Sequence, residues 1–396
     1  MPRPKKPVYE YVEKLDRYRK RIKDADGKYV AIYGKDPDEL TQKIAEAEAQ
    51  IKDTKFRREN PTVKEYAEKW LKMQAANIRA STLVDYTSCV KIYIIGTLGA
   101  RFMCEITADD VKLAITKAAE KSASVYRKTQ MLFKQIFRSA EESGVIDRSP
   151  CDKLNPRGGK PAQEKVALTK EQETVLVESV VGLPVYPFVM LGLYAGLRRE
   201  ESLALKWDCV TLDGDAPHIS VRRTWHIENN RPVIEDELKS KASKRDIPIP
   251  PKLRECLEEV KASSKSEYVI ANSDGTPLSG TQWQRLWKYV VTRTTKERTY
   301  TRYGKDGEKV KHTVTPILGQ KAPHNNTVVY SMDFIPTPHQ LRHTYITNLL
   351  LAGVDVKTVQ YLAGHEHARI TLDIYAHLTY NRPVDLKDKV NKAFSG

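Results

Sequence analysis

The sequence predicts a multidomain protein with a small α+β N-terminal domain, an all-α domain, and a larger, mainly α domain with a small β-sheet. Three patterns predict this order. Alternating segments around a turn signal mark the first region, and helical periodicity alone marks the second. In the third, helices flank one alternating, turn-rich segment. A length of 396 residues favours more than one domain, and 40% apolar residues suffice for packed cores.

Residues 1–56 are expected to form the small α+β domain. Segments 18–22 (YRKRI) and 28–34 (KYVAIYG) alternate as strands do, and the DADG between them is a turn signal. A segment with helical periodicity follows. The first strand carries Arg19 and Arg21, which suit contact with DNA; solvated charge on a minor domain is the alternative interpretation.

Residues 61–150 are predicted to form an almost entirely helical, four-helix domain. Thr62 and Glu65 have the spacing of a capping box ahead of an apolar face. A later helix, SVYRKTQMLFKQIFRSAEESG, has one apolar face and is expected to stop at Gly144. The following segment, 149–166, is rich in proline, glycine and charge, so it reads as an extended linker.

Residues 166–396 form the largest predicted domain. A helix should begin at Thr169, and VYPFVMLGLYAGLRREESLALKW is expected to be one long, mostly buried helical stretch. The segment that follows alternates around Asn229 and Asn230, which predicts a hairpin or meander. The later segments TPHQLRHTYITNLLLAG and DVKTVQYLAG are read as helices that each end at a glycine.

Charge narrows the class of partner. The formal net charge of +15 and a pI near 9.3 favour a polyanion, most often nucleic acid, although a basic ordinary enzyme remains the alternative. The five cysteines lack metal-ligand spacing and suggest reduced thiols in a cytoplasmic protein. The N-terminus lacks the apolar core of a secretory signal, and no apolar run is long enough to cross a bilayer, so no membrane association is expected.

Several chemically distinctive residues cluster in the last sixty positions. Thr337 is a candidate N-cap, so His339 and Arg342 lie on one face near the positive end of a helix, a place to hold an oxyanion. Gly364 can adopt the left-handed cap and expose His365 on a tight loop. Tyr375 follows ten residues later and, by itself, is more typical of a packed aromatic.

A further charged residue stands in apolar surroundings. Arg198 follows the small residues of an Ala-Gly segment within a predicted buried helix, so it should be paired or functional. Glu201, three residues on, lies on the same helical face and could steady it.

The segments AGLRREESLALKW, HQLRHT, LAGH and IYAHL, in this order and spacing, resemble the tyrosine recombinase (phage integrase) family. The resemblance covers the whole third region. The helical second region is similar to the core-binding domain of that family, and the first region resembles the arm-binding domain of integrases from phages and conjugative transposons.

The resemblance implies roles for individual residues. Tyr375 would be the nucleophile, and Glu201 the acidic residue beside the first arginine. The other matched catalytic residues are Arg198, His339, Arg342 and His365.

The family also uses a hairpin lysine as general acid. Lys239 and Lys241 compete for this role; they lie two apart on an expected strand and so face the same side. Lys239 matches the family pattern better, with Lys241 in support. Lys244 and Arg245 are expected to touch DNA phosphate instead.

By resemblance, the protein would cut and rejoin double-stranded DNA through a 3′-phosphotyrosyl intermediate as a homotetramer on core sites, with arm sites as a possible second DNA target. The resemblance implies that two arginines neutralise the phosphate charge in place of metal ions held by carboxylates, so no metal or cofactor is expected. An excisionase or DNA-bending protein is a possible partner. The C-terminal tail could dock on a neighbouring protomer or pack on its own domain.

Residues 292–335 depart from the family pattern, because this stretch is longer than in most members. The alternation around Lys305 and Gly307 predicts a basic β-hairpin, with Arg302 as a DNA contact. We expect this insertion to touch DNA or a neighbouring subunit.

Three alternative functions are compatible with much of the same residue pattern. A type IB topoisomerase has the same tyrosine chemistry, but the expected arm domain and tail argue against it. A non-catalytic DNA-binding regulator would have lost a catalytic residue, whereas every expected position is filled. A resolvase or invertase uses the same chemistry as an integrase and remains open.

Overall fold

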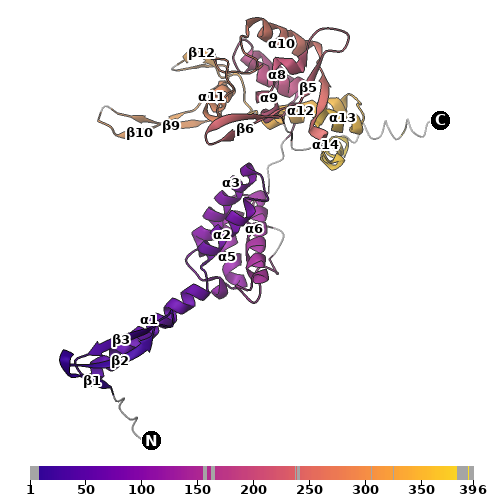
Figure 1. Ribbon diagram of the computed structural model, residues 1–396. Helices are drawn as coiled ribbons and strands as arrows, with labels where there is room; N and C mark the ends of the chain where they lie inside the picture. The colour runs from indigo at the N-terminus through magenta and orange to yellow at the C-terminus, as the bar shows by residue number, and fades with distance from the viewer. Residues whose placement is uncertain are drawn as a thin grey trace. The chain divides into compact units, whose positions relative to one another are not determined.

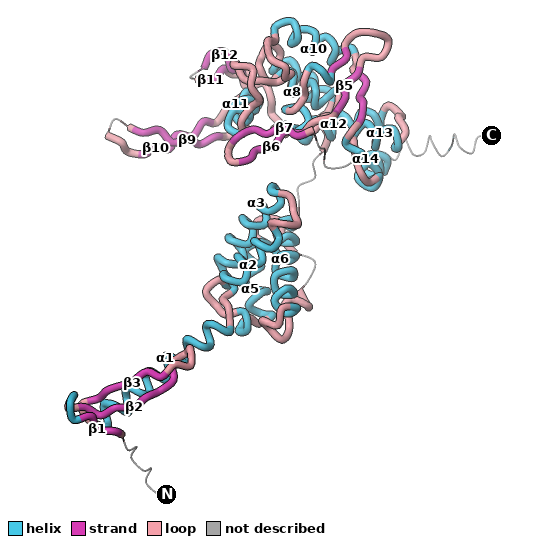
Figure 2. The backbone as a smooth tube through the Cα atoms, in the orientation of Figure 1, coloured by secondary structure: helices cyan, strands magenta, loops and turns pink. Residues whose placement is uncertain are grey.

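The computed structural model describes residues 9–154, 158–161, 166–236, 238, 241–304, 306–323, 325–380 and 391. The chain divides into two compact units, residues 1–164 and 165–396 (Figure 1). The division falls inside the linker expected over 149–166. About half of the chain is helical, and its strands form small antiparallel sheets (Figure 2).

The N-terminal sheet is antiparallel and ordered β1-β2-β3. Its elements and the helix packed on them are β1 (Glu10–Val12), β2 (Arg17–Lys23), β3 (Tyr29–Gly34) and α1 (Pro37–Glu59). Both predicted strands are confirmed to within one residue at each end. Asp36 caps α1 by accepting hydrogen bonds from the backbone N–H groups of Asp38 and Glu39. Gly34 allows α1 to pack closely against β3, because a Cβ on this residue would lie 2.7 Å from the Cβ of Leu40 in α1.

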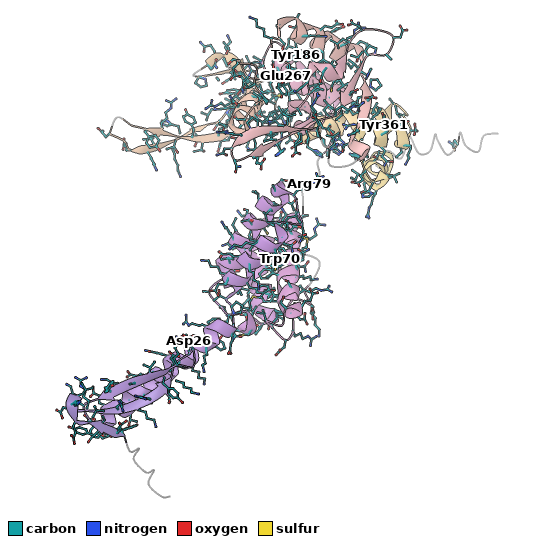
Figure 3. The ribbon with its side chains drawn as sticks, in the orientation of Figure 1. Asp26, Trp70, Arg79, Tyr186, Glu267 and Tyr361 are labelled. Atoms are coloured by element: carbon teal, nitrogen blue, oxygen red, sulfur yellow. The ribbon has the colours of Figure 1, made fainter. Side chains whose placement is uncertain are left out.

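The helical region follows within the same unit. It consists of α2 (Val63–Gln74), α3 (Ala80–Cys89), a π-helical turn (Val90–Ile95), α4 (Gly96–Leu98), α5 (Ala108–Ala119) and α6 (Ala123–Glu142). The predicted capping box is present, since Thr62 N–H donates to Glu65 and Glu65 N–H donates to the Thr62 hydroxyl. Trp70, labelled in Figure 3, lies in a core with Phe133 and Phe137. Gly144 has a φ of 68° just beyond α6, as a helix stop requires.

The second unit is built around α8, every residue of which except the first and last is buried. Its helices are α7 (Lys170–Val180), α8 (Tyr186–Tyr194), α9 (Arg199–Leu203), α10 (Pro251–Ser263), α11 (Gly280–Val291), α12 (Pro338–Leu351), α13 (Val356–Ala363) and α14 (Ala368–Tyr380). Gly192 permits α8 and α12 to pack closely, because a Cβ there would lie 2.8 Å from the Leu341 Cβ. The core of this unit therefore fixes the start of α12.

Four small sheets accompany these helices: β4-β5-β8, β6-β7, β9-β10 and β11-β12. Their strands are β4 (Val210–Thr211), β5 (His218–Val221), β6 (Thr224–Glu228), β7 (Arg231–Glu235), β8 (Arg245–Pro248), β9 (Arg298–Tyr303), β10 (Lys309–Val314), β11 (Lys321–Ala322) and β12 (Asn325–Val329). The turn between β6 and β7 has positive φ at Asn229 and Asn230, so the predicted hairpin is confirmed. The predicted hairpin in the insertion is confirmed as β9 and β10.

Two sequence predictions are wrong in detail. The expected continuous helix breaks between α8 and α9, because Gly196 adopts a φ of 59° and leaves no room for a Cβ beside Tyr345. Lys241 does not lie on a strand; its backbone opens a short 3₁₀ turn, 241–243, before β8.

Candidate active site

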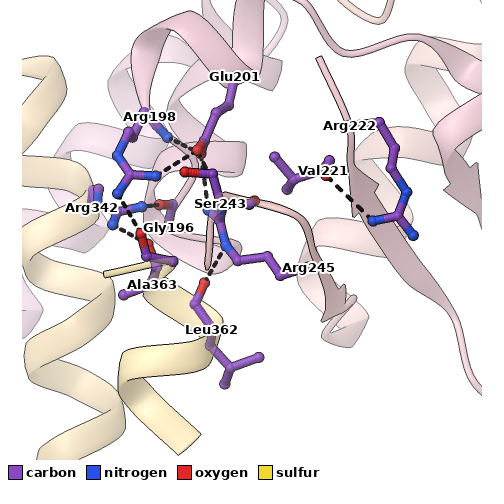
Figure 4. Close-up of polar contacts among 11 residues, drawn as sticks. Gly196, Arg198, Glu201, Val221, Arg222, Ser243, Arg245, Arg342, Leu362 and Ala363 are labelled. Atoms are coloured by element: carbon purple, nitrogen blue, oxygen red, sulfur yellow. Dashed lines mark hydrogen bonds and ion pairs between the residues drawn. The ribbon is translucent and has the colours of Figure 1, made fainter. Parts of the chain in front are cut away.

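The break between α8 and α9 places Arg198 in extended conformation at the start of α9. Its backbone N–H donates to Glu201 Oε2 at 2.9 Å, and its Nη1 donates to Glu201 Oε1 at 2.7 Å. Nη2 donates to the carbonyl of Gly364 at 2.7 Å. Figure 4 shows the contact between Arg198 and Glu201. The Arg198 side chain remains 33% exposed, so part of its fork is available to a ligand. The expected support of Arg198 by Glu201 is therefore present.

Arg342 projects from the first turns of α12 and is only 2% exposed. It donates through Nη1 to the carbonyl of Gly196 at 2.7 Å and through Nη2 to the carbonyl of Ala363. Burial, and then the neighbouring charge of Arg198, lower the pKa of Arg342 to about 9. A bound anion would relieve both effects, so the site is built to receive negative charge.

Arg245 occupies a different place from the one expected. Its side chain is 0% exposed, so the prediction that it touches DNA phosphate is wrong for this structure. It donates to both oxygens of Glu201, at 2.9 and 3.1 Å, and to the carbonyls of Ser243 and Leu362, at 2.9 and 2.8 Å. Strand alternation explains the burial, since Arg245 and Ile247 point inward from β8.

Glu201 is the carboxylate that Arg198 and Arg245 share, and it is buried between them. Burial acts to raise the pKa of Glu201, but Arg245 and Arg198 outweigh it and lower the pKa to about 2. The carboxylate therefore stays charged at neutral pH. Because Glu201 is one carboxylate beside three arginines, Arg198, Arg245 and Arg342, the cluster carries net positive charge.

His365 follows the left-handed cap of α13 at Gly364, which has the predicted conformation with a φ of 61°. The expectation that the loop exposes His365 is wrong, because this residue is only 8% exposed. Its Nδ1 lies 2.9 Å from the hydroxyl of Thr371 in α14. Thr371 was not predicted from the sequence, although a hydroxyl in the first turn of the next helix is the kind of group that could orient a histidine.

His339 and Arg342 line one pocket of about 300 Å³ with Arg198. Thr337 and Pro338 open α12 as predicted, and the Thr337 hydroxyl accepts from the Gln340 N–H at 3.3 Å. His339 itself is exposed. The structure thus brings together the two arginines and the first histidine that the sequence singled out.

Three expected catalytic side chains lie outside the described part of the structure. Lys239 is not among the described residues, and the side chains of Lys241 and Tyr375 are not described. The backbone of Tyr375 lies in α14, the helix whose Thr371 contacts His365. The C-terminal tail beyond residue 380 is also outside the described residues, apart from residue 391.

The other expected DNA contacts lie on the surface. Arg19 is 23% exposed and paired with Glu10 at 2.7 Å, whereas Arg21 and Lys244 are exposed. Arg302 is exposed on β9, with its guanidinium carbon 5.2 Å from the centre of the Tyr300 ring.

Among the residues that the structure describes, no three His, Cys, Asp or Glu side chains gather as a metal site would require. In the same residues, no helix has both the length and the apolar character needed to span a bilayer.

The protonation of His365 gives a testable expectation. Burial, and then the charges of Arg342 and Arg198, lower its pKa to about 3, so the ring should stay neutral throughout the working pH range. Its depressed pKa contributes stability that is present above the ordinary value of 6.5 and is lost as the pH falls toward 3.

We expect the His365 ring signal, measured by NMR on ¹³C-histidine-labelled protein and assigned with His365→Asn, not to titrate between pH 5 and 8. A midpoint for His365 near 6.5 would show that the arginine cluster does not act on this ring as the structure indicates.

Comparison with known proteins agrees with the fold. Residues 63–157 match the phage integrase central domain, and residues 321–382 match the phage integrase family. An integrase of Streptomyces ambofaciens is 23% identical over 79% of this chain and 76% of its own length. The transposase from transposon Tn916 of Enterococcus faecalis is 23% identical over 81% of this chain and 75% of its own.

Solved structures show the same fold. The Tn1549 transposon integrase in complex with transposon right end DNA has a TM-score of 0.63 at 20% identity, over 85% of this chain and 100% of that one. A lambda integrase dimer bound to a core site has a TM-score of 0.56 at 18% identity, over 95% of this chain and 96% of that one. The chain is a tyrosine-type site-specific recombinase, and its segments 63–157 and 321–382 match models of the phage integrase family.

Proposed function

We propose that this protein is the integrase of a mobile element, which cuts and rejoins double-stranded DNA through a 3′-phosphotyrosyl intermediate. The observation that carries the proposal is the pocket that Arg198, Arg342 and His339 line together. Relatives named as a transposon transposase and as integrases, and neighbours solved on transposon-end or core-site DNA, support a mobile element and a DNA substrate.

The two arginines are suited to a scissile phosphodiester. Its negative charge grows when a nucleophile attacks phosphorus, and preorganised donors stabilise that charge without reorganising. Each guanidinium fork matches two phosphate oxygens. Arg198 and Arg342 are held by backbone carbonyls, which fixes their positions before substrate arrives.

The proton transfers require three further groups. Tyr375 would attack phosphorus and pass its proton to His339, which is exposed at the pocket. Lys239, or alternatively Lys241, would protonate the departing 5′ oxygen. The phosphotyrosyl bond keeps the energy of the broken phosphodiester, so a new 5′-hydroxyl can displace Tyr375 without an energy source.

The contact between His365 and Thr371 supports a donor role for this histidine. When the Thr371 hydroxyl donates to Nδ1, the neutral ring carries its proton on Nε2. That N–H can then donate to a non-bridging phosphate oxygen. The pKa of His365, lowered to about 3 by burial and the arginines, favours this neutral form.

The DNA-binding surfaces would lie on all three expected domains, 1–56, 61–150 and 166–396. On β2, strand alternation places Arg17, Arg19, Arg21 and Lys23 on one face. We propose that this face binds a separate arm site, and that the helical domain and the catalytic domain bind the core site. Strand exchange would take place in a tetramer, as the lambda integrase tetramer bound to a Holliday junction suggests by analogy. An accessory excisionase or bending protein remains part of this proposal.

We also propose that the β9–β10 hairpin contacts DNA phosphates. Arg302, Lys309 and Lys311 are exposed on it, and an isolated two-stranded hairpin is marginally stable without a partner. Replacing these three residues by glutamine should weaken DNA binding and flatten its salt dependence. The log–log slope should fall by about one for each phosphate that the hairpin no longer neutralises.

The matched control removes the same charge from α10, with Lys252, Arg254 and Lys261 replaced by glutamine. Fluorescence anisotropy over a series of salt concentrations measures both slopes. Equal slopes for the hairpin variant and the wild-type protein would exclude the phosphate contacts.

One assay tests the proposed function as a whole. The protein is incubated with nicked suicide duplexes that carry candidate sites from the flanks of its own gene. A covalent protein–DNA adduct with a free 5′-hydroxyl on the released strand is the expected product. Relaxation of supercoiled DNA that needs no specific site, with no recombinant product, would instead indicate a topoisomerase.

A further inference from the structure

The end of α13 is bound by three arginines at once. The carbonyls of Leu362, Ala363 and Gly364 accept hydrogen bonds from Arg245, Arg342 and Arg198, in that order along the chain (Figure 4). The last carbonyls of a helix have no partner within it and carry partial negative charge. Guanidinium groups are therefore suitable caps for this end of α13.

Arg245 differs from the other two arginines. Arg198 and Arg342 line the candidate active-site pocket, whereas the side chain of Arg245 is fully buried and does not line it. A group in this position cannot bind the phosphate directly. It acts on the site only through the residues that it contacts.

Glu201 is the link between Arg245 and Arg198. Its Oε1 accepts from Nη1 of both arginines, at 2.7 Å from Arg198 and 3.1 Å from Arg245. Its Oε2 accepts from the backbone N–H of Arg198 and from Nη2 of Arg245, both at 2.9 Å. The position of Arg245 thus sets the direction of the carboxylate that holds the Arg198 fork.

The turn at Gly364 is the second link. A Cβ at Gly364 would lie 2.8 Å from Nη1 and 3.0 Å from Cζ of Arg245. The same glycine provides the left-handed cap and the carbonyl that Arg198 binds, and His365 follows it directly. Arg245 therefore packs against the turn that carries His365.

We infer that Arg245 is a positioning residue for DNA cleavage: it fixes Glu201 and the end of α13, and through them Arg198 and His365. This inference rests on the proposed function. Lysine could not replace Arg245, because one ammonium cannot match both oxygens of Glu201 and also reach Leu362. Small displacements of the groups that bind the reacting phosphate are costly, so the expected loss is in the cleavage rate and not in DNA affinity.

The test compares Arg245→Lys and Arg245→Met with the wild-type full-length protein on a suicide duplex. Single-turnover adduct formation at saturating protein should slow by about 10- to 100-fold, while the Kd for the duplex stays unchanged. Circular dichroism at the assay temperature gives the folded fraction by which each rate is normalised. Should Arg245→Met fail to fold, Arg245→Lys carries the test with the same expectation.

A control arginine separates positioning from general stabilisation. Arg223→Met removes ion pairs to Asp208 at 2.7 Å and Asp236 at 2.8 Å from a side chain that is 21% exposed in the same unit. It should lower stability but leave the normalised rate unchanged. In a Glu201→Gln background, Arg245→Met should add little further slowing, because the shared carboxylate is already altered.

The outcomes are distinct. Normalised wild-type rates for both Arg245 variants, with an active wild-type protein, would overturn the inference alone. If the rate losses caused by Arg245→Met and Glu201→Gln are additive, Arg245 does not act through the Glu201 carboxylate. Absence of any adduct from the wild-type protein would count against the proposed function itself.

Discussion

Tyr375→Phe is expected to abolish covalent adduct formation while leaving DNA binding intact. Phenylalanine keeps the ring and the helix-forming backbone of α14 but removes the oxygen that would attack phosphorus. The arginines proposed to bind the phosphate, Arg198 and Arg342, lie on other elements and are unchanged. Denaturing gel electrophoresis after incubation with a suicide duplex measures the adduct, and a mobility shift measures binding.

Tyr361→Phe is the matched control for this experiment. Tyr361, labelled in Figure 3, lies on α13 and accepts a hydrogen bond from the Asp246 N–H at 3.1 Å. Its replacement removes a tyrosine hydroxyl in the same domain without touching the pocket, so adduct formation should persist. Adduct from Tyr375→Phe would mean that another residue is the nucleophile.

Arg198→Lys is expected to give the second largest effect. Lysine keeps the positive charge but cannot donate to Glu201, Gly364 and a phosphate with the geometry of the guanidinium fork. Loss of one preorganised donor slows such reactions by about 10²–10³-fold, so single-turnover cleavage should fall by that order. DNA affinity should change little, because many phosphate contacts besides Arg198 are expected to contribute to it.

Arg254→Lys is the control for replacing a guanidinium group by an ammonium group. Arg254 is paired with Glu258 on the surface of α10 at 2.8 Å, and the pair lies outside the pocket. This variant should cleave at the wild-type rate. If Arg198→Lys cleaves as fast as Arg254→Lys, Arg198 does not stabilise the transition state.

Patterns of residues a few positions apart were sufficient to predict much of the fold. The capping box of Thr62 and Glu65, the N-cap at Thr337 and the cap at Gly364 all depend on residues a few positions apart, and each forms as expected. The pairing of Arg198 with Glu201 is equally local. The helix break at Gly196 was missed because its cause is distant, namely the ring of Tyr345 on α12.

The pocket residues Arg198, His339 and Arg342 were predictable from the sequence, whereas the partners that hold Arg342 were not. The acceptors of Arg342 lie on segments 146 and 21 residues away, and no spacing rule predicts such carbonyl partners. Arg245 was predicted to touch DNA phosphate together with Lys244, but its side chain is buried. The alternation of Arg245, Ile247 and Ile249 was the available signal, since it places the arginine on the apolar side of β8.

We propose that guanidinium groups, and not a divalent ion, stabilise the charge as Tyr375 attacks DNA. The most direct measurement is adduct formation on the suicide duplex in excess chelator, followed by protease digestion and mass spectrometry of the DNA-linked peptide. We expect an undiminished yield of adduct and a phosphotyrosyl bond at Tyr375. Loss of the adduct with chelator, or a DNA link at any other residue, would contradict it.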